Sequence, residues 1–308
     1  MSLGDEGQRK AGVVLTDRLA GGVWGHLVGD ALGVPYEFKA PRDIGRVVWG
    51  HKGSHGQPPG TWSDDGGLTL ALLDSLLSVG FDPIDQGQRF LRWSYGEEYC
   101  PGPPFDIGTT TSRALRRLES GVSAEDAGGR SVDDNGNGSL MRILPIVLVG
   151  RDAPAGELVT MAMRSSAITH GHARAKVTCA VYCLLAQQML TGQPPTSALE
   201  HALGDARASL PTELHRELQI LETHSVRSGA GYVVDCFWSA YQSLNSSDSY
   251  QGTVTRAIKY GNDTDTTAAV AGGLAGIYWG VGAIPDEWLR QMRGHEIVDP
   301  LIARLFPK

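Results

Sequence analysis

Helical periodicity dominates this chain, and almost nothing in it alternates as a strand requires. The run at residues 67–79, GLTLALLDSLLSV, is apolar on nearly every side, which predicts a buried central helix. The strand-like run at residues 46–49 is too short to build a sheet. Further helices are expected at residues 16–33, 86–95, 109–120, 139–150, 155–168, 171–191, 195–208, 212–227, 234–244, 249–260, 266–280 and 286–293. We therefore expect an all-α fold, a single compact multi-helix domain over residues 1–308 with its core at about 12–295.

Charge and cysteine usage narrow the class of protein. The formal net charge is −7 and no basic run is present, which argues against general nucleic-acid binding. No long uncharged apolar run predicts a membrane span. Cys179 and Cys183 stand four residues apart in an apolar helical stretch, so we expect buried thiols rather than a disulfide or a metal site. A monomer in the reducing cytoplasm fits these features.

Two acidic clusters, about 200 residues apart, carry most of the chemical information. The first is Ser63-Asp64-Asp65 and the second is residues 263–266, Asp-Thr-Asp-Thr. Each stands just before an apolar helical stretch. Helix capping explains one oxygen in each cluster, because Ser, Thr and Asp are favoured at helix N-termini. The surplus of oxygens instead suits hard cations such as Mg²⁺ or Mn²⁺, provided that the fold brings the clusters together.

The helix after the second cluster carries a stripe of small residues. Gly272, Gly276 and Gly280 recur every four residues. Glycine weakens a helix, so this stripe predicts close packing of the helix backbone against a neighbour. The second acidic cluster would then stand at the N-terminal end of a central helix.

Three other segments are candidates for binding or catalysis. Residues 135–139, Asn-Gly-Asn-Gly-Ser, feed a helix and are either a plain capped turn or an anion site built from free N–H groups. Asp30 and Glu37 stand among apolar residues; Glu37 is either a surface carboxylate or a functional acid with a shifted pKa. His170 and His172 at a helix junction favour a helix cap or a ligand contact, because a zinc site needs more nitrogen or sulfur ligands.

In their order along the chain, these elements resemble the ADP-ribosylglycohydrolase family. The matching runs are GDALGVPYEF at 29–38, WSDD at 62–65, DIGTTT at 106–111, NGNGSLMR at 135–142, THGHA at 169–173 and GNDTDTTAAVAGGLAG at 261–276. They span roughly residues 16–280. The resemblance implies an all-α domain with a binuclear centre of two divalent cations, Mg²⁺ or Mn²⁺.

The resemblance also implies a role for individual residues. Those that match the metal ligands are Ser63, Asp64, Asp65, Asp263, Asp265 and Thr266. Those that match the lining of the ADP-ribose site are Asp106, Gly108, Asn137, Gly138, Ser139, Met141 and His170. Glu37 matches a catalytic acid near the metals, and we expect Glu37 and Asp65 to act in catalysis. One departure stands out: Gly66 replaces the second Thr of the Thr-Asp-Asp-Thr often found in the family.

The activity implied by the resemblance is hydrolysis of the N- or O-glycosidic bond between ADP-ribose and an acceptor, by a carboxylate-assisted, metal-dependent mechanism. An ADP-ribosylated protein side chain is the expected substrate, with arginine the first choice of acceptor. Serine, a nucleobase or a small molecule remain alternatives. A non-catalytic ADP-ribose-binding relative, of a crystallin or immunity type, is the alternative from another class, and a generic phosphohydrolase is a third.

Overall fold

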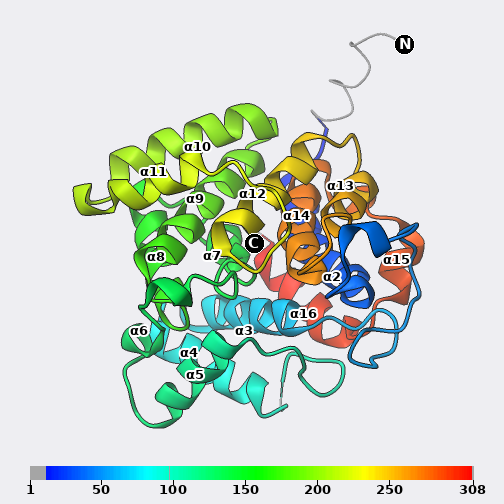
Figure 1. The fold of residues 1–308 in the computed structure, drawn as a ribbon, viewed down its shortest axis with the longest axis horizontal. Coiled ribbons are helices and arrows are strands. Elements are labelled where there is room, and N and C mark those ends of the chain that lie inside the picture. The colour runs from blue at the N-terminus through cyan, green and yellow to red at the C-terminus, as the bar shows by residue number, and fades with distance from the viewer. Residues whose placement is uncertain (1–11, 97, 307–308) are drawn as a thin grey trace.

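Two helices buried on almost every side, α2 (Leu15–Gly33) and α14 (Thr264–Trp279), pack together at the centre of the protein (Figure 1). The computed structural model describes residues 12–96 and 98–306. A third central helix, α3 (Asp64–Val79), runs across one end of this pair. Its buried residues include nearly all of its first three turns, as the apolar run at 67–79 predicted. The three helices place their polar ends near one another, which prepares the site described below.

Glycines on α2 and α14 let the two backbones touch. A Cβ atom on Gly25 or on Gly272 would overlap the carbonyl oxygen of the other residue, and one on Gly276 would overlap that of Gly21. The close packing predicted from Gly272 and Gly276 is therefore confirmed. Gly280 does not belong to the stripe: it lies beyond the last residue of α14 and ends the helix with a φ of 81°, a backbone conformation that favours glycine.

The remaining helices cover this centre (Figure 1). Helices α8 to α11 form a group on one side, α13 and α15 lie on the other, and α4 and α5 lie below α3. Their bounds are α4 Pro83–Ser94, α5 Thr109–Glu119, α6 Ala124–Ala127, α7 Leu144–Val149, α8 Ala155–Ala167, α9 Ala173–Leu190, α10 Pro195–Ser209, α11 His215–Thr223, α12 Val233–Asn245, α13 Tyr250–Ile258, α15 Asp286–Gln291 and α16 His295–Leu305. Short 3₁₀ turns lie at Val34–Tyr36, Pro41–Asp43, Val132–Asp134, Thr212–Leu214 and Val281–Ala283. No strand is assigned in the described ranges, so the all-α prediction is confirmed.

Several helices differ from the sequence prediction: α6 was not predicted, and the helix expected at 212–227 is a 3₁₀ turn followed by the shorter α11. The helix expected at 139–150 begins only at Leu144, because Pro145 has no N–H and suits the first turn of a helix rather than its interior. Helix α16 was not predicted, since Pro300 interrupts its pattern. It forms because Val298, Leu301 and Ile302 bury their side chains, with α3 and α2 as its main packing partners.

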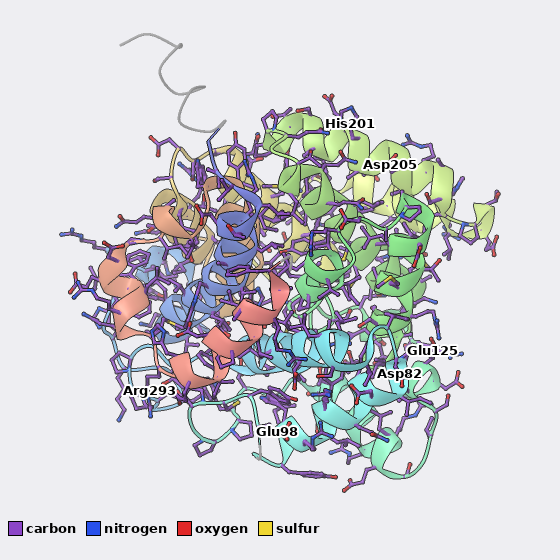
Figure 2. All side chains as sticks on the ribbon, turned by 180° about the vertical axis from the view of Figure 1, so that it is seen from behind. Asp82, Glu98, Glu125, His201, Asp205 and Arg293 are labelled. Atoms are coloured by element: carbon purple, nitrogen blue, oxygen red, sulfur yellow. The ribbon has the colours of Figure 1, made fainter. Side chains whose placement is uncertain are left out.

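Charged side chains surround this apolar centre. Glu98, His201 and Arg293 are exposed and project from the periphery (Figure 2). Within the part of the chain that the structure describes, no helix combines the length and the apolar character needed to cross a bilayer.

Candidate metal centre and substrate cavity

The two acidic clusters meet where the N-terminal ends of α3 and α14 come together. The Thr266 hydroxyl donates to Oδ1 of Asp65 at 3.2 Å, joining residues 201 positions apart. Ser63 is the N-cap of α3, and its Oγ accepts from the Asp65 N–H at 3.2 Å. Capping therefore explains Ser63 but leaves the buried carboxylates of both clusters unexplained.

Asp30 of α2 brings a further carboxylate to the same place. Its two oxygens accept from the Ser63 N–H at 2.9 and 3.1 Å, and Oδ2 also accepts from the Gly66 N–H at 2.8 Å. Burial nevertheless raises the pKa of Asp30 to about 7. Asp30 thus ties the start of α3 to the central helix pair and adds a titratable group to the site.

Asp30, Asp65 and Asp265 form a buried acidic triad, with one carboxylate oxygen of each within 4.8 Å of the others. Neither carboxylate oxygen of Asp265 has a hydrogen-bond partner among the described residues, and neither does Oδ2 of Asp65. Burial, reinforced by the neighbouring carboxylates, raises the pKa of Asp65 and of Asp265 well above the ordinary value. Buried carboxylates without partners are costly. An all-oxygen set with unsatisfied atoms fits Mg²⁺ or Mn²⁺, which would neutralise the charge.

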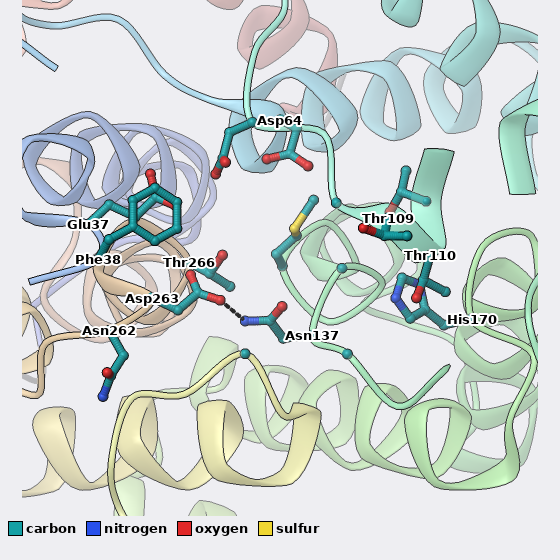
Figure 3. A pocket seen from close by; sticks show the side chains of 17 residues that line it. Glu37, Phe38, Asp64, Thr109, Thr110, Asn137, His170, Asn262, Asp263 and Thr266 are labelled. Atoms are coloured by element: carbon teal, nitrogen blue, oxygen red, sulfur yellow. Dashed lines mark hydrogen bonds between the residues drawn. The ribbon is translucent and has the colours of Figure 1, made fainter. Parts of the chain in front are cut away.

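A cavity of about 570 Å³ lies beside the acidic triad, within the usual size range of small-molecule sites. In Figure 3, Glu37 and Phe38 lie at one end of it, and Thr110 and His170 lie at the other. Asp263 and Asn137 lie between them, joined by a hydrogen bond. The lining residues are Glu37, Phe38, Asp64, Asp106, Gly108, Thr109, Thr110, Thr111, Gly136, Asn137, Gly138, Met141, His170, Gly231, Asn262, Asp263 and Thr266.

A second group of titratable side chains lies at the Glu37 end of the cavity. Nε2 of His55 is 3.2 Å from Oε2 of Glu37 and 3.4 Å from Oδ1 of Asp106, and the Ser54 hydroxyl donates to the same Glu37 oxygen at 3.3 Å. Burial, followed by the charges of Asp106 and Asp263, raises the pKa of Glu37 to about 9. Glu37 is therefore buried at the edge of the cavity and is not a surface carboxylate.

The glycine-rich loop lines the cavity and is joined to the second acidic cluster by a hydrogen bond. The Asn137 side-chain amide donates to Oδ2 of Asp263 at 2.8 Å, and the Asn137 N–H donates to the Gly231 carbonyl at 2.9 Å. Ser139 points the other way: its Oγ accepts from the Ser166 hydroxyl at 2.9 Å and lies 3.4 Å from the Cys179 sulfur. Ser139 is fully buried in the core and does not line the cavity.

The two histidines of residues 170 and 172 have different positions. His172 is the N-cap of α9, and its Nδ1 accepts from the Arg174 N–H at 3.1 Å. His170 is buried and lines the cavity. The helix cap, one of the two roles that the sequence left open, is thus filled by His172, whereas His170 lies in the wall of the cavity.

Comparison with known proteins shows which family this chain belongs to. Residues 12–308 match the family profile described as ADP-ribosylglycohydrolase. This chain belongs to the ADP-ribosylglycohydrolase family. The resemblance seen in the motifs is thereby confirmed.

Similar members of the ADP-ribosylglycohydrolase family match along most of their length. The ADP-ribosylarginine hydrolase Tri1 of Pseudomonas putida is 30% identical over 298 residues, covering 95% of this chain and 78% of the relative. The ADP-ribosyl-[dinitrogen reductase] glycohydrolase of Rhodospirillum rubrum is 30% identical over 283 residues, covering 90% of each. A solved structure described as an ADP-ribosylglycohydrolase-related protein complex has a TM-score of 0.79 at 34% identity, covering 94% of this chain and 97% of that one.

The ADP-ribosylglycohydrolase motifs thus converge on one place. The motif residues that line the cavity are Glu37, Asp64, Asp106, Gly108, Asn137, Gly138, Met141, His170, Asp263 and Thr266. Ser63 does not line the cavity but accepts from Asp65, whose carboxylate lies with that of Asp265 in the acidic triad. Ser139 alone of these residues turns its hydroxyl into the core.

Sequence reasoning missed some residues of this ADP-ribosylglycohydrolase site. His55 lies in a loop of glycine, proline and polar residues that gave no motif. Phe38 and Asn262 both line the cavity and both have a positive φ. Two backbone hydrogen bonds join their loops: the Phe38 N–H donates to the Asn262 carbonyl at 2.8 Å, and the Asn262 N–H donates to the Lys39 carbonyl at 2.9 Å. Asp30 stands among apolar residues in the sequence, and a carboxylate in such surroundings is the signal that it belongs to the site.

The departure at Gly66 from the family's usual threonine has a local cause. A Cβ atom on Gly66 would lie 2.6 Å from the Trp62 ring and 2.7 Å from Leu27 Cδ2. The Trp62 ring is held in place because its Nε1 donates to the Tyr99 carbonyl at 3.0 Å. Glycine at this position therefore accompanies a buried tryptophan, and the Gly66 N–H still reaches Asp30.

Restoring the family's threonine with Gly66→Thr should destabilise this protein by about 2 kcal/mol, because the new side chain overlaps a ring that cannot move freely. Urea unfolding of the variant and the wild type measures the difference. Gly204→Ala serves as the control, since nothing lies within 4 Å of its new Cβ atom. A Gly66→Thr protein as stable as the wild type would show that Trp62 does not dictate the glycine.

Proposed function

We propose that this protein is a metal-dependent hydrolase that cleaves the glycosidic bond between ADP-ribose and an arginine side chain of a modified protein. The observation that carries the proposal is the buried acidic triad, whose unsatisfied oxygens lie beside a cavity of about 570 Å³. Membership of the ADP-ribosylglycohydrolase family supplies the reaction class. The non-catalytic alternative is disfavoured, because all four aspartates of the two clusters are retained.

We assign the cation sites to the two acidic clusters, with Ser63, Asp64, Asp65, Asp263, Asp265 and Thr266 as the residues that would hold two Mg²⁺ or Mn²⁺ ions. Asp30 supports this set through the start of α3. When bound, such ions supply Lewis acidity and orient ribose hydroxyls. The carboxylates of this end of the cavity would stabilise positive charge that develops on the ribose ring.

Glu37 is the residue that we propose to move the proton. Its carboxyl lies at the cavity edge, in hydrogen-bond range of His55 and Ser54. A pKa raised to about 9 keeps Glu37 protonated at neutral pH while the cations are absent, and nearby positive charge would favour its ionised form. Glu37 would then take a proton from the attacking water or give one to the leaving group.

The acceptor is proposed from similar proteins together with charge. Two relatives at about 30% identity carry names that specify ADP-ribosylarginine or ADP-ribosylated dinitrogen reductase. The Glu37 end of the cavity gathers the carboxyls of Glu37 and Asp106, which suits a guanidinium group. All four cysteines are free thiols, which supports action in the reducing cytoplasm.

Glu37→Gln should lower kcat by about 100-fold or more while leaving the affinity for free ADP-ribose nearly unchanged, because the amide keeps the shape but cannot exchange the proton. Release of ADP-ribose from ADP-ribosylated arginine, with Mg²⁺ or Mn²⁺ present, measures kcat, and calorimetry measures affinity. The exposed Glu157→Gln is the matched control. Full turnover by Glu37→Gln would remove Glu37 from the mechanism.

A panel of substrates tests the acceptor separately. ADP-ribose linked to arginine, to serine and to a nucleobase should be offered to the wild type under the same conditions. We expect turnover of the arginine linkage to exceed that of the others. Turnover of another linkage alone would reject the arginine assignment, and ADP-ribose binding without turnover of any linkage would favour the non-catalytic alternative.

A further inference from the structure

A buried cation lies behind the His170 end of the cavity. Arg142 is fully buried, and no ion pair involves it within the described residues. Its Nη2 donates to the Ser165 carbonyl at 2.9 Å and to the Thr169 hydroxyl oxygen at 3.0 Å. Its guanidinium carbon lies 4.5 Å from the centre of the Phe90 ring. Burying a charge without a counter-ion is expensive, so the position of Arg142 calls for an explanation beyond packing.

The direction of the hydrogen bonds is fixed by chemistry. A guanidinium group only donates, so the Thr169 hydroxyl oxygen must accept from Arg142. The single hydroxyl hydrogen of Thr169 then points to Nδ1 of His170, 2.9 Å away. With the proton on Nδ1 instead, that hydroxyl hydrogen would have no acceptor among the described residues. The chain from Arg142 through Thr169 therefore leaves Nδ1 of His170 as an acceptor and puts the ring proton on Nε2.

The Nε2 atom of His170 lies on the cavity side, beside the glycine-rich loop. A Cβ atom added to Gly136 would lie 3.5 Å from Nε2, and one added to Gly138 would lie 3.3 Å from it. No hydrogen bond from Nε2 to another described residue is present, and His170 lines the cavity. Burial, together with the positive charges of Arg142 and Arg113, lowers the pKa of His170 to about 3. At neutral pH the ring is therefore uncharged.

We propose that Arg142 is a positioning residue that acts through Thr169 to hold His170 in its Nε2–H form, so that the cavity presents a hydrogen-bond donor to an acceptor oxygen of ADP-ribose. The glycines at 136 and 138 leave room for the ring edge and for that oxygen. The nature of the ligand rests on the proposed function, whereas the form of His170 rests on the hydrogen bonds alone. A buried threonine and arginine thus set what one wall of the cavity can recognise.

Nitrogen chemical shifts of His170 test the first part on the full-length wild type without any substrate. We expect Nδ1 to resonate as an unprotonated ring nitrogen and Nε2 as a protonated one, unchanged from pH 6 to pH 8. The resonances are assigned by comparison with His170→Gln. A protonated Nδ1 in the wild type, or a ring that gains a proton in this pH range, would overturn the proposal whatever the substrate is.

Two substitutions at Thr169 test the second part, with free ADP-ribose as the probe. Thr169→Val keeps the shape but cannot relay the hydrogen bond, so we expect mixed His170 forms and about tenfold weaker ADP-ribose binding. Thr169→Ser keeps the hydroxyl and should retain the wild-type nitrogen shifts and affinity. Thr253→Val, at a fully buried threonine of α13, controls for the stability cost of the change.

The outcomes separate the two proposals. Nitrogen shifts that are the same in Thr169→Val and in the wild type would overturn the positioning role, even if ADP-ribose binds. Altered shifts with unchanged ADP-ribose affinity would overturn the role of Nε2 in recognition. A wild type with the expected shifts but no affinity for ADP-ribose would reject the proposed function while leaving the relay intact.

Discussion

Asp265→Asn should abolish metal-dependent turnover, lowering kcat by about 100-fold or more, while the protein stays folded. Both carboxylate oxygens of Asp265 are buried without a hydrogen-bond partner in the part of the chain that the structure describes, so the side chain contributes little to the fold but would be a direct cation ligand. The stabilisation of the fold by Mg²⁺ should be lost along with turnover. Mg²⁺ at one hundred times its dissociation constant should stabilise the wild type by about 2.7 kcal/mol and the variant much less.

The sign of the pH effect supplies a second measurement for Asp265→Asn. Burial raises the pKa of Asp265 well above 3.8, so the folded, metal-free protein holds a proton that the unfolded chain releases. The stability of the metal-free wild type therefore falls as the pH rises above about 3.8. Asparagine has no such proton, so at pH 7 the metal-free variant should be at least as stable as the metal-free wild type. Thermal unfolding in a chelating buffer measures this.

The exposed Asp152→Asn is the control for both measurements, because its side chain is 94% exposed. It should keep turnover and the stabilisation by Mg²⁺. Retention of full metal-dependent activity by Asp265→Asn would contradict the ligand assignment. Loss of the fold in metal-free Asp265→Asn would show instead that the carboxyl is structural.

Gly276→Ala should destabilise the protein by about 3 kcal/mol or more. The added Cβ atom overlaps the carbonyl oxygen of Gly21, and neither backbone can move without separating α2 from α14. Because Gly33 at the end of α2 packs against the backbone of Asp265, any separation also moves the acidic triad. Urea unfolding should show the loss, and stabilisation by Mg²⁺ should weaken with it.

Gly204→Ala provides the matched control for this helix substitution. Gly204 lies inside α10 with nothing within 4 Å of the new Cβ atom, so alanine should stabilise the helix by about 0.5–1 kcal/mol. A loss of stability in Gly276→Ala together with a gain in Gly204→Ala would attribute the loss to the α2–α14 contact. A Gly276→Ala protein that unfolds like the wild type would mean that the two helices tolerate a wider spacing.

Periodicity was sufficient to predict most of the helices but not where some of them begin. The run at 67–79, apolar on nearly all sides, predicted α3 as a central helix, and the stripe of small residues predicted the same for α14. It failed at α16, where packing on α3 outweighs an internal proline. The stripe on α14 was read from the sequence, but its counterpart on α2 was not, although Gly21, Gly25, Gly29 and Gly33 have the same spacing.

The site was predictable where its residues form motifs and not where single side chains arrive from loops. The motif residues were named from their family resemblance, and most of them line one cavity. His55 comes from a loop without periodicity, so only the fold reveals that it lies between Glu37 and Asp106. The inward turn of Ser139 follows from its contact with Ser166, which no local pattern encodes.

The members of the acidic triad stand on three separate helices, at residues 30, 65 and 265. An ion held by all three would act as a brace across the whole chain. It could not be captured by a nascent polypeptide before residue 265 had been synthesised and docked. Acquisition of the ion would therefore be a late event in biogenesis, and an ion-loaded molecule would be one in which α2, α3 and α14 have already docked.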